Sequence, residues 1–251
     1  MFAERRQGGN DPQGWAHNFL GDRQQPLPVL RDSQVAGGLP WQALRARVSA
    51  PATVLDAGCG LGAWVDLVHR HGYQGIGVDY AAPMIERLQR ERPGPRWIAA
   101  DIRDVPLPAE SVDAIVSWGV IEHDSAGPGA ALREFHRLLK PGGWLLATVP
   151  SDTPQQRASS RAQFPEGQGE FFQYFFANHE LGAEVTAAGF DLDLLQPSSS
   201  HYALVHPTLY GRVLKLPAPL RRVANHTLMR YAAHLPAAQS MVLAVGRRRV
   251  A

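Results

Sequence analysis

The chain has 251 residues, 45% of them apolar and 19% charged, a composition that excludes a disordered acidic or basic polymer as its main content. The formal net charge of +2 conceals a division along the sequence. Asp193 is the last acidic residue, and eight of the 25 basic side chains follow it. Residues 1–193 hold the other 17 basic and all 23 acidic residues, so they carry −6 and the tail carries +8. The tail therefore needs an interpretation of its own.

The cellular setting can be inferred from what the sequence lacks. Cys59 is the single cysteine, which excludes an internal disulfide and a multi-cysteine metal site, and we expect no metal. The first residues contain no apolar segment of the secretory type. No run approaches the ~18 uninterrupted apolar residues that a membrane-spanning helix requires. We expect a cytoplasmic protein, with peripheral contact at a membrane surface as the alternative.

Strands and helices are predicted to alternate from residue 51 onward. Predicted strands are 53–56, 75–78, 96–100, 112–118 and 144–149, and predicted helices are 63–70, 85–91 and 130–139. The strands are apolar throughout, and such strands are typical of a parallel sheet covered by helices on both faces. The sequence thus predicts a doubly wound α/β fold.

Acidic residues end the first three predicted strands. They are Asp56, Asp79 and Asp101. Doubly wound sheets bind their ligands at the carboxyl ends of the strands. We therefore expect these carboxylates to lie in a ligand site.

The loop after the first strand contains three alternate glycines, Gly58, Gly60 and Gly62, and supports two interpretations. With Asp79 19 residues after Gly60, it resembles the G-x-G-x-x-A pattern of dinucleotide-binding proteins. As D-x-G-x-G-x-G it would suit a ligand without a pyrophosphate. In both cases glycine allows positive φ angles and close approach of the backbone.

Five ordered motifs resemble those of class I S-adenosylmethionine (SAM)-dependent methyltransferases. They read VLDAGCGLG at 54–62, GVD at 77–79, ADIRDVPL at 100–107, VDAIVS at 112–117 with IEH at 121–123, and LKPGG at 139–143. The match is strong over about residues 51–150 and most similar to the type 11 branch of ubiquinone- and menaquinone-biosynthesis enzymes. It implies a Rossmann-like, mostly parallel seven-stranded sheet of order 3-2-1-4-5-7-6, with an antiparallel edge strand and a helical cap insertion.

The same resemblance implies SAM as the cofactor and assigns roles to matching residues. Asp79 would accept hydrogen bonds from the ribose hydroxyls, and Asp101 with the Ile102 amide would bind adenine. Asp56 and Gly58 would lie beside the methionine ammonium. The other expected cofactor-binding residues are Cys59, Gly60, Gly62, Tyr80, Ser117 and Trp118.

The acceptor side is less clearly marked. His123 is the candidate catalytic base and an acceptor contact. Residues 171–176 contain five aromatic side chains in six positions. They are either a strand packed under the next helix or a wall for an apolar or aromatic acceptor, with Gln173 and Tyr174 as polar contacts. His201 and Tyr202 are further candidates.

The sulfonium of SAM already activates the methyl group, so an oriented and desolvated nucleophile suffices for in-line displacement. We expect methylation of a small-molecule acceptor at oxygen or nitrogen, in secondary or lipid and quinone metabolism. No nucleic-acid partner is expected, because the turn SWGV at 117–120 lacks the signature of nucleic-acid amino methyltransferases. The alternatives are an NAD-dependent oxidoreductase, a SAM-binding protein without turnover and a peripheral membrane protein.

The chain divides into a flexible segment (1–40) and one methyltransferase domain (41–251). That domain contains a cofactor-binding core (51–150) and acceptor-side insertions at 150–177 and 198–238. Within residues 209–235, a predicted helix at 220–235 places an apolar stripe opposite basic side chains, and a shorter helix is predicted at 209–216. They are predicted to cover the acceptor pocket, to contact a membrane surface, or to bind a partner or an anionic substrate. The oligomeric state stays open.

Overall fold

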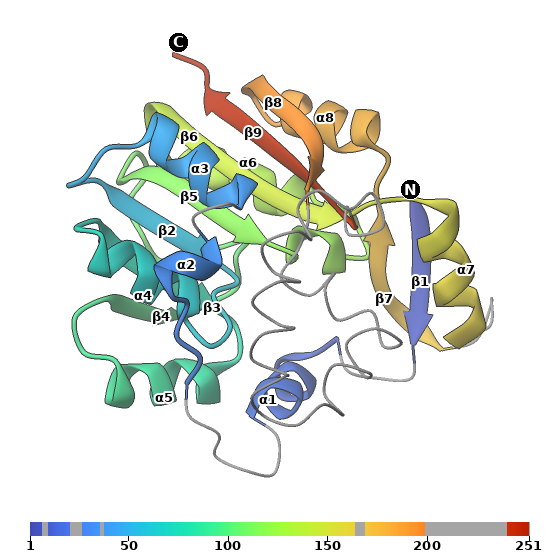
Figure 1. Cartoon of the computed structure of the whole chain (residues 1–251), viewed down its shortest axis with the longest axis horizontal. Coiled ribbons are helices and arrows are strands. Elements are labelled where there is room, and N and C mark those ends of the chain that lie inside the picture. The colour runs from blue at the N-terminus through green and yellow to red at the C-terminus, as the bar shows by residue number, and fades with distance from the viewer. Residues whose placement is uncertain (7–9, 21–26, 36–37, 164–168, 199–239, 251) are drawn as a thin grey trace.

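A seven-stranded sheet forms the centre of the computed structural model, which describes residues 1–6, 10–20, 27–35, 38–163, 169–198 and 240–250 (Figure 1). Its order is β4-β3-β2-β5-β6-β9-β8. The strands are β2 (Thr53–Ala57), β3 (Gln74–Asp79), β4 (Arg96–Ala99), β5 (Val112–Trp118), β6 (Leu139–Pro150), β8 (Phe190–Ser198) and β9 (Met241–Arg248). This confirms the strand order 3-2-1-4-5-7-6.

The sheet is parallel except at one strand. β9 pairs antiparallel with both β6 and β8, so it lies one position in from the edge and β8 is the edge strand. β2, β3, β4, β5 and β6 pair in parallel. Their carboxyl ends therefore meet along one side of the sheet, where ligands of doubly wound folds bind.

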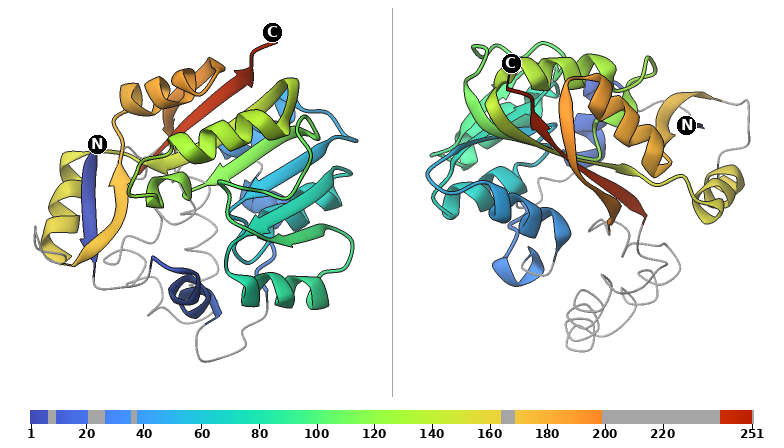
Figure 2. Two further views of the ribbon diagram at one scale, coloured as in Figure 1. Left: turned by 180° about the vertical axis from the view of Figure 1, so that it is seen from behind. Right: turned by 90° about the horizontal axis from the view of Figure 1, so that it is seen from above.

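Helices cover both faces of the sheet (Figure 2). Successive residues of a strand face opposite sides, and both sides are buried here. Val54 belongs to a buried cluster with residues of α3 (Leu39–Arg47) and α4 (Ala63–Arg70). Leu55 belongs to the cluster that contains residues of α6 (Gly129–Leu138) and α8 (Asn178–Ala187). Burial on both faces explains the uniformly apolar strands.

A second, two-stranded sheet joins the start of the chain to the aromatic run. β1 (Phe2–Arg6) pairs antiparallel with β7 (Glu170–Phe175). Glu4 is buried there and accepts a hydrogen bond from Gln173 Nε2 at 2.7 Å. Residues 1–40 also contain α1 (Pro12–Leu20) and α2 (Asp32–Val35). Regular elements thus occur in the segment that the sequence predicts to be flexible, and the strand that pairs with β1 is distant in sequence.

The remaining elements complete the described part of the chain. They are α5 (Ala82–Glu91), the short 3-10 helix η1 (Ile121–His123) and α7 (Pro154–Gln163). None of the described helices has the length and apolar character needed to cross a membrane. His201, Tyr202 and the amphipathic stretch 209–235 lie outside the described residues.

Three basic residues of the tail do lie in the described part. Arg248 pairs with Glu110 at 2.9 Å and Arg249 with Asp191 at 2.8 Å. Arg247 Nε donates to the carbonyl oxygen of Gly142 at 3.2 Å. Part of the basic excess is thus neutralised by acidic residues of the preceding fold.

Candidate active site

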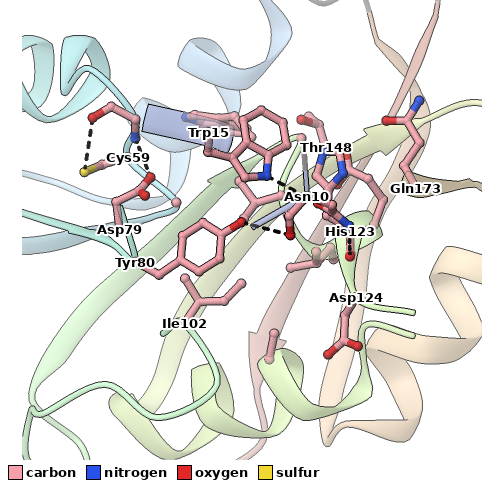
Figure 3. A pocket seen from close by; sticks show the side chains of 18 of the residues that line it. Asn10, Trp15, Cys59, Asp79, Tyr80, Ile102, His123, Asp124, Thr148 and Gln173 are labelled. Atoms are coloured by element: carbon pink, nitrogen blue, oxygen red, sulfur yellow. Dashed lines mark hydrogen bonds and ion pairs between the residues drawn. The ribbon is translucent and has the colours of Figure 1, made fainter. Parts of the chain in front are cut away.

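A cavity of about 1080 Å³ lies at the carboxyl ends of β2, β3 and β5, and residues of the loop after β4 also line it (Figure 3). Side chains from α1, η1 and β7 close its other side. Residues expected at the cofactor and at the acceptor therefore share one cavity.

The glycine loop forms the floor beside β2. The backbone N–H groups of Gly58 and Cys59 both donate to the carbonyl oxygen of Val78, at 2.8 and 2.9 Å. Gly58 has a φ of +84°, and a Cβ there would lie 2.4 Å from Val120 Cγ2. The loop thus presents bare backbone to the cavity at a position that only glycine fits.

Gly62 has a different task. Its φ is +71°, and a Cβ would lie 2.6 Å from Trp97 Cη2 and 2.8 Å from Leu88 Cδ2. Gly62 is not one of the described residues that line the cavity. The third glycine therefore allows the start of α4 to pack against β4 and α5.

Asp79 is a rigid acceptor at the end of β3. Its Oδ2 accepts a hydrogen bond from Gly60 N at 2.9 Å, and its Oδ1 accepts one from Ala81 N at 3.0 Å. Burial raises the pKa of this carboxyl, while the backbone donors act in the opposite direction. The side chain lines the cavity and keeps lone pairs for ligand hydroxyls.

The neighbouring carboxyl residue Asp56 is buried, with 3% of its surface exposed to solvent. Burial and the charge of Asp79 raise the pKa of Asp56 to about 8. Two carboxyls in a dry site cannot both ionise cheaply, and a nearby cation favours the ionised form. The pair therefore suits a positively charged ligand, and SAM and its product both carry an ammonium group.

Asp101 is held by a partner that sequence reasoning missed. Arg103 donates to both of its carboxylate oxygens, at 2.9 and 2.6 Å, and to Asp124 at 3.0 Å. The hydrogen bond from Arg103 lowers the pKa of Asp101 despite partial burial. The expected adenine acceptor thus lies in the cavity as part of an acid–base–acid cluster.

The other residues expected to bind the cofactor divide into two groups. Tyr80, Ile102 and Trp118 line the cavity. Ser117 is fully buried beneath it and donates to the carbonyl oxygen of Ala57 at 3.0 Å. Cys59 lines the cavity, but burial raises the pKa of its thiol, which matches a packed residue and not a reactive thiol.

The aromatic run expected at the acceptor forms strand β7, and part of it lines the cavity. Phe171, Phe172 and Gln173 of β7 line the cavity, together with His123. The Gln173 amide is bound to Glu4, as described above. Tyr174 does not line the cavity, and its hydroxyl donates to the carbonyl oxygen of Ser125 at 2.9 Å.

Three further residues complete the site, and sequence patterns gave little warning of them. Asn10 and Trp15 line the cavity from the start of the chain, where no motif marked them. Glu122 is 1% exposed, and burial raises its pKa to about 8. Its Oε2 has no hydrogen-bond partner within the part of the chain that the structure describes. The IEH motif contained Glu122, but only the fold shows that its carboxyl is buried.

The fold and the site define a class of protein, and a comparison with family models agrees. Residues 34–195 match the model described as a methyltransferase domain. Because this is more than half of the chain, the chain belongs to that family, within the class I SAM-dependent methyltransferases. The match replaces the dinucleotide-binding interpretation of the glycine loop.

Curated relatives match part of the chain. Malonyl-[acyl-carrier protein] O-methyltransferase of Yersinia pestis is 33% identical over 115 residues, 46% of this chain and 43% of that protein. A Mycobacterium tuberculosis protein named "Probable S-adenosylmethionine-dependent methyltransferase" is 35% identical over 113 residues, 44% of this chain and 40% of its own length. The chain thus spans less than half the length of either relative.

Solved structures share the architecture across nearly all of the chain. One comes from a complex that contains the Haloferax volcanii Trm112 methyltransferase activator, with a TM-score of 0.64, 19% identity and coverage of 97% of this chain and 98% of that chain. The [4+2]-cyclase SpnF has a TM-score of 0.60 at 20% identity, covering 84% and 80%. Such low identities show the fold alone.

Proposed function

We propose that this protein transfers the methyl group of SAM to an oxygen or nitrogen atom of a small-molecule acceptor, in secondary or lipid and quinone metabolism. The observation that carries the proposal is the single cavity that joins the strand-end carboxylates to the aromatic wall. A methyl donor and its acceptor must lie within a few ångströms of each other. One cavity lined by both sets of residues meets that requirement.

The cofactor side fits the chemistry of SAM. Asp79 would accept hydrogen bonds from the ribose hydroxyls, and its negative charge disfavours a cofactor with a 2′-phosphate. Asp56 and the backbone at Gly58 would bind the ammonium group. Asp101 and the Ile102 amide would bind adenine. SAM supplies an activated methyl group when bound, and the residues of the chain orient it and exclude water.

The acceptor side contains one candidate base. His123 Nδ1 lies 2.8 Å from the carbonyl oxygen of Phe172, which can only accept a hydrogen bond. In the neutral imidazole the proton is then on Nδ1 and the lone pair on Nε2, which lies 4.0 Å from Glu122 Oε1. In this proposal Nε2 takes the acceptor's proton. Phe171 and Phe172 supply an apolar surface for the rest of the acceptor.

Charge narrows the class of acceptor. Among the described residues, seven carboxyl side chains line the cavity and Arg103 is the single arginine or lysine. The carboxyl residues are Asp11, Asp56, Asp79, Asp101, Glu122, Asp124 and Glu170. Asp56 and Glu122, with pKa values of about 8, are mostly protonated at pH 7, but the other five carboxylates still outnumber Arg103. Such a lining repels anions, so we propose a neutral or amine-bearing acceptor with an aromatic or apolar body.

For the basic insertion at 198–238 we propose a cover over the acceptor side. Ser198 at the end of β8 pairs with Met241 at the start of β9, and Met241 lines the cavity. The insertion thus leaves and rejoins the fold at the rim of the cavity. Membrane contact is the alternative, and co-sedimentation with anionic liposomes tests it. Loss of binding in Arg221→Glu/Arg222→Glu would favour the membrane over the cover.

Calorimetry and an acceptor panel test the function. We expect S-adenosylhomocysteine (SAH) to bind to the wild type and roughly 100-fold more weakly to Asp79→Ala, because two hydrogen bonds to a charged group are lost. Asp191→Ala is the matched control, since Asp191 is an exposed aspartate on the edge strand. Phenols, aromatic amines and aliphatic amines form the panel, with methyl transfer followed from labelled SAM. Binding of NAD without SAH would contradict the cofactor, and SAH binding without any methylation would favour a non-catalytic SAM-binding protein.

A further inference from the structure

One side chain ties the start of the chain to the acceptor side of the cavity. Asn10, just before α1, donates from Nδ2 to the carbonyl oxygens of His123 and Phe172, at 3.0 and 3.1 Å. Its Oδ1 accepts a hydrogen bond from Trp15 Nε1 at 3.3 Å. Figure 3 shows Asn10 between Trp15 and His123. The amide thus joins α1, η1 and β7 at one point.

The backbone of the same residue reaches the cofactor side. Tyr80 Oη donates to the carbonyl oxygen of Asn10 at 3.5 Å. Tyr80 directly follows Asp79, which we assign to the ribose. Asn10 is therefore in contact with both sides of the cavity.

The orientation of His123 depends on a carbonyl that Asn10 also binds. Phe172 O lies 2.8 Å from His123 Nδ1 and accepts the hydrogen bond from Asn10 Nδ2. Trp15 and Phe172 pack edge-on to the imidazole, each with ring centroids 4.9 Å from it. These contacts fix both the tautomer and the direction of the ring.

Among neutral side chains as short as that of asparagine, only an amide can donate two hydrogen bonds and accept a third. It offers two N–H donors and one oxygen acceptor. A carboxylate of the same shape would place oxygens against two carbonyl oxygens and could not donate. The chemistry of the position therefore selects asparagine.

We propose that Asn10 is a positioning residue that closes the N-terminal segment over the cavity and fixes the Phe172 carbonyl that orients His123. The proposal rests on the proposed function, in which His123 Nε2 takes the acceptor's proton. It adds that this base is oriented by a residue 113 positions earlier in the chain. It assigns to the acceptor side a segment that carries none of the family's motifs.

Two variants and a matched control test this role. Asn10→Asp removes both donors at constant shape, and Trp15→Phe removes the indole N–H while keeping an aromatic ring. Gln13→Glu makes the same amide-to-carboxylate change at an exposed position of α1. The readouts are the ¹⁵N shifts of the His123 imidazole, assigned by their loss in His123→Gln, and amide hydrogen exchange over residues 10–20.

In the wild type with SAH we expect His123 protonated on Nδ1. In Asn10→Asp we expect a mixture of tautomers and at least about tenfold faster exchange in residues 10–20. Trp15→Phe should change the imidazole shifts and the amide exchange in the same direction, but by less. If Asn10→Asp does not fold, the result for Trp15→Phe decides whether Asn10 has the positioning role. Gln13→Glu should match the wild type.

Wild-type shifts and exchange in Asn10→Asp, or in Trp15→Phe where Asn10→Asp does not fold, would overturn the positioning role. Equal effects of Gln13→Glu and Asn10→Asp would overturn it as well, because added charge would then be the cause. Failure of the wild type to bind SAH would instead contradict the proposed function. In that case the His123 tautomer and the amide exchange of residues 10–20, measured in the ligand-free protein, still test the positioning role of Asn10.

Discussion

The two sides of the cavity are built in different ways. On the cofactor side, Asp56, Asp79 and Asp101 lie at the carboxyl ends of β2, β3 and β4, three strands that follow one another along the chain and pair in parallel. On the acceptor side, β1 pairs with β7 and Asn10 contacts Phe172, partners about 160 residues or more apart in sequence. The first side is local in sequence and the second is assembled from distant segments.

This difference explains how a shared cofactor and a particular acceptor can coexist in one fold. The cofactor residues depend on the main sheet, whose strands are buried on both faces. The acceptor residues depend on a two-stranded sheet and a short helix beside it. We therefore expect changes in the second set to alter the choice of acceptor without disturbing the cofactor residues.

The largest effect should come from the glycine loop. Gly58→Ala places a Cβ 2.4 Å from Val120 Cγ2 at a φ of +84°. We expect the free energy of unfolding to fall by about 3 kcal/mol and SAH affinity to fall at least about tenfold. Denaturant unfolding and calorimetry measure the two effects.

Gly72→Ala is the control for that substitution. Gly72 has a φ of +85°, but the nearest atom to an added Cβ is Ala50 Cβ at 3.7 Å. It should lose about 1 kcal/mol from backbone strain and leave SAH affinity unchanged. Equal losses in the two variants would show that strain alone acts and that the loop is not a close cradle.

The second effect is a proton released on binding. At pH 7 the Asp56 carboxyl, with a pKa of about 8, is mostly protonated in the ligand-free protein. An incoming ammonium group favours the carboxylate, so SAH binding should release up to about one proton at pH 7 and few above pH 9. Calorimetry in buffers of different ionisation enthalpy measures this number. Asp56→Asn should abolish the release, and an unchanged release would place the ammonium elsewhere.

These outcomes bear on how much the sequence could reveal. Asp56, Asp79 and the glycines could be predicted because the apolar strands, the glycine loop and the acidic residues all lie within about twenty-five positions of sequence. Arg103 was missed because its role depends on the distance to Asp124 across the cavity mouth. Asn10 and Trp15 were missed because a β1–β7 pairing leaves no local pattern. Tyr174 was expected at the acceptor, but it does not line the cavity, and its hydroxyl donates to the carbonyl oxygen of Ser125.

A third effect separates Glu122 from surface carboxyls. Burial raises the pKa of both Asp56 and Glu122 to about 8, while the unfolded chain ionises them near pH 4. The unfolded state therefore binds fewer protons between about pH 4 and pH 8. Stability should decrease as pH rises through that window and level off above it. In Glu122→Gln this decrease should be shallower, as followed by denaturant unfolding at several pH values. An unchanged slope would mean that Glu122 ionises normally.

The smallest effect is expected at Tyr174. Tyr174→Phe removes one hydrogen bond to Ser125 O at an exposed site, worth at most about 1 kcal/mol. We expect a slightly lower melting temperature and unchanged SAH affinity. A large loss of methyl transfer would return Tyr174 to the acceptor contacts.

The most direct measurement is a crystal structure of the full chain with SAH. The account predicts the ribose hydroxyls at Asp79, the ammonium beside Asp56 and Gly58, and the sulfur directed toward His123 and Phe172. SAH bound outside this cavity, or with its sulfur turned away from the aromatic wall, would contradict the claim that donor and acceptor share one site.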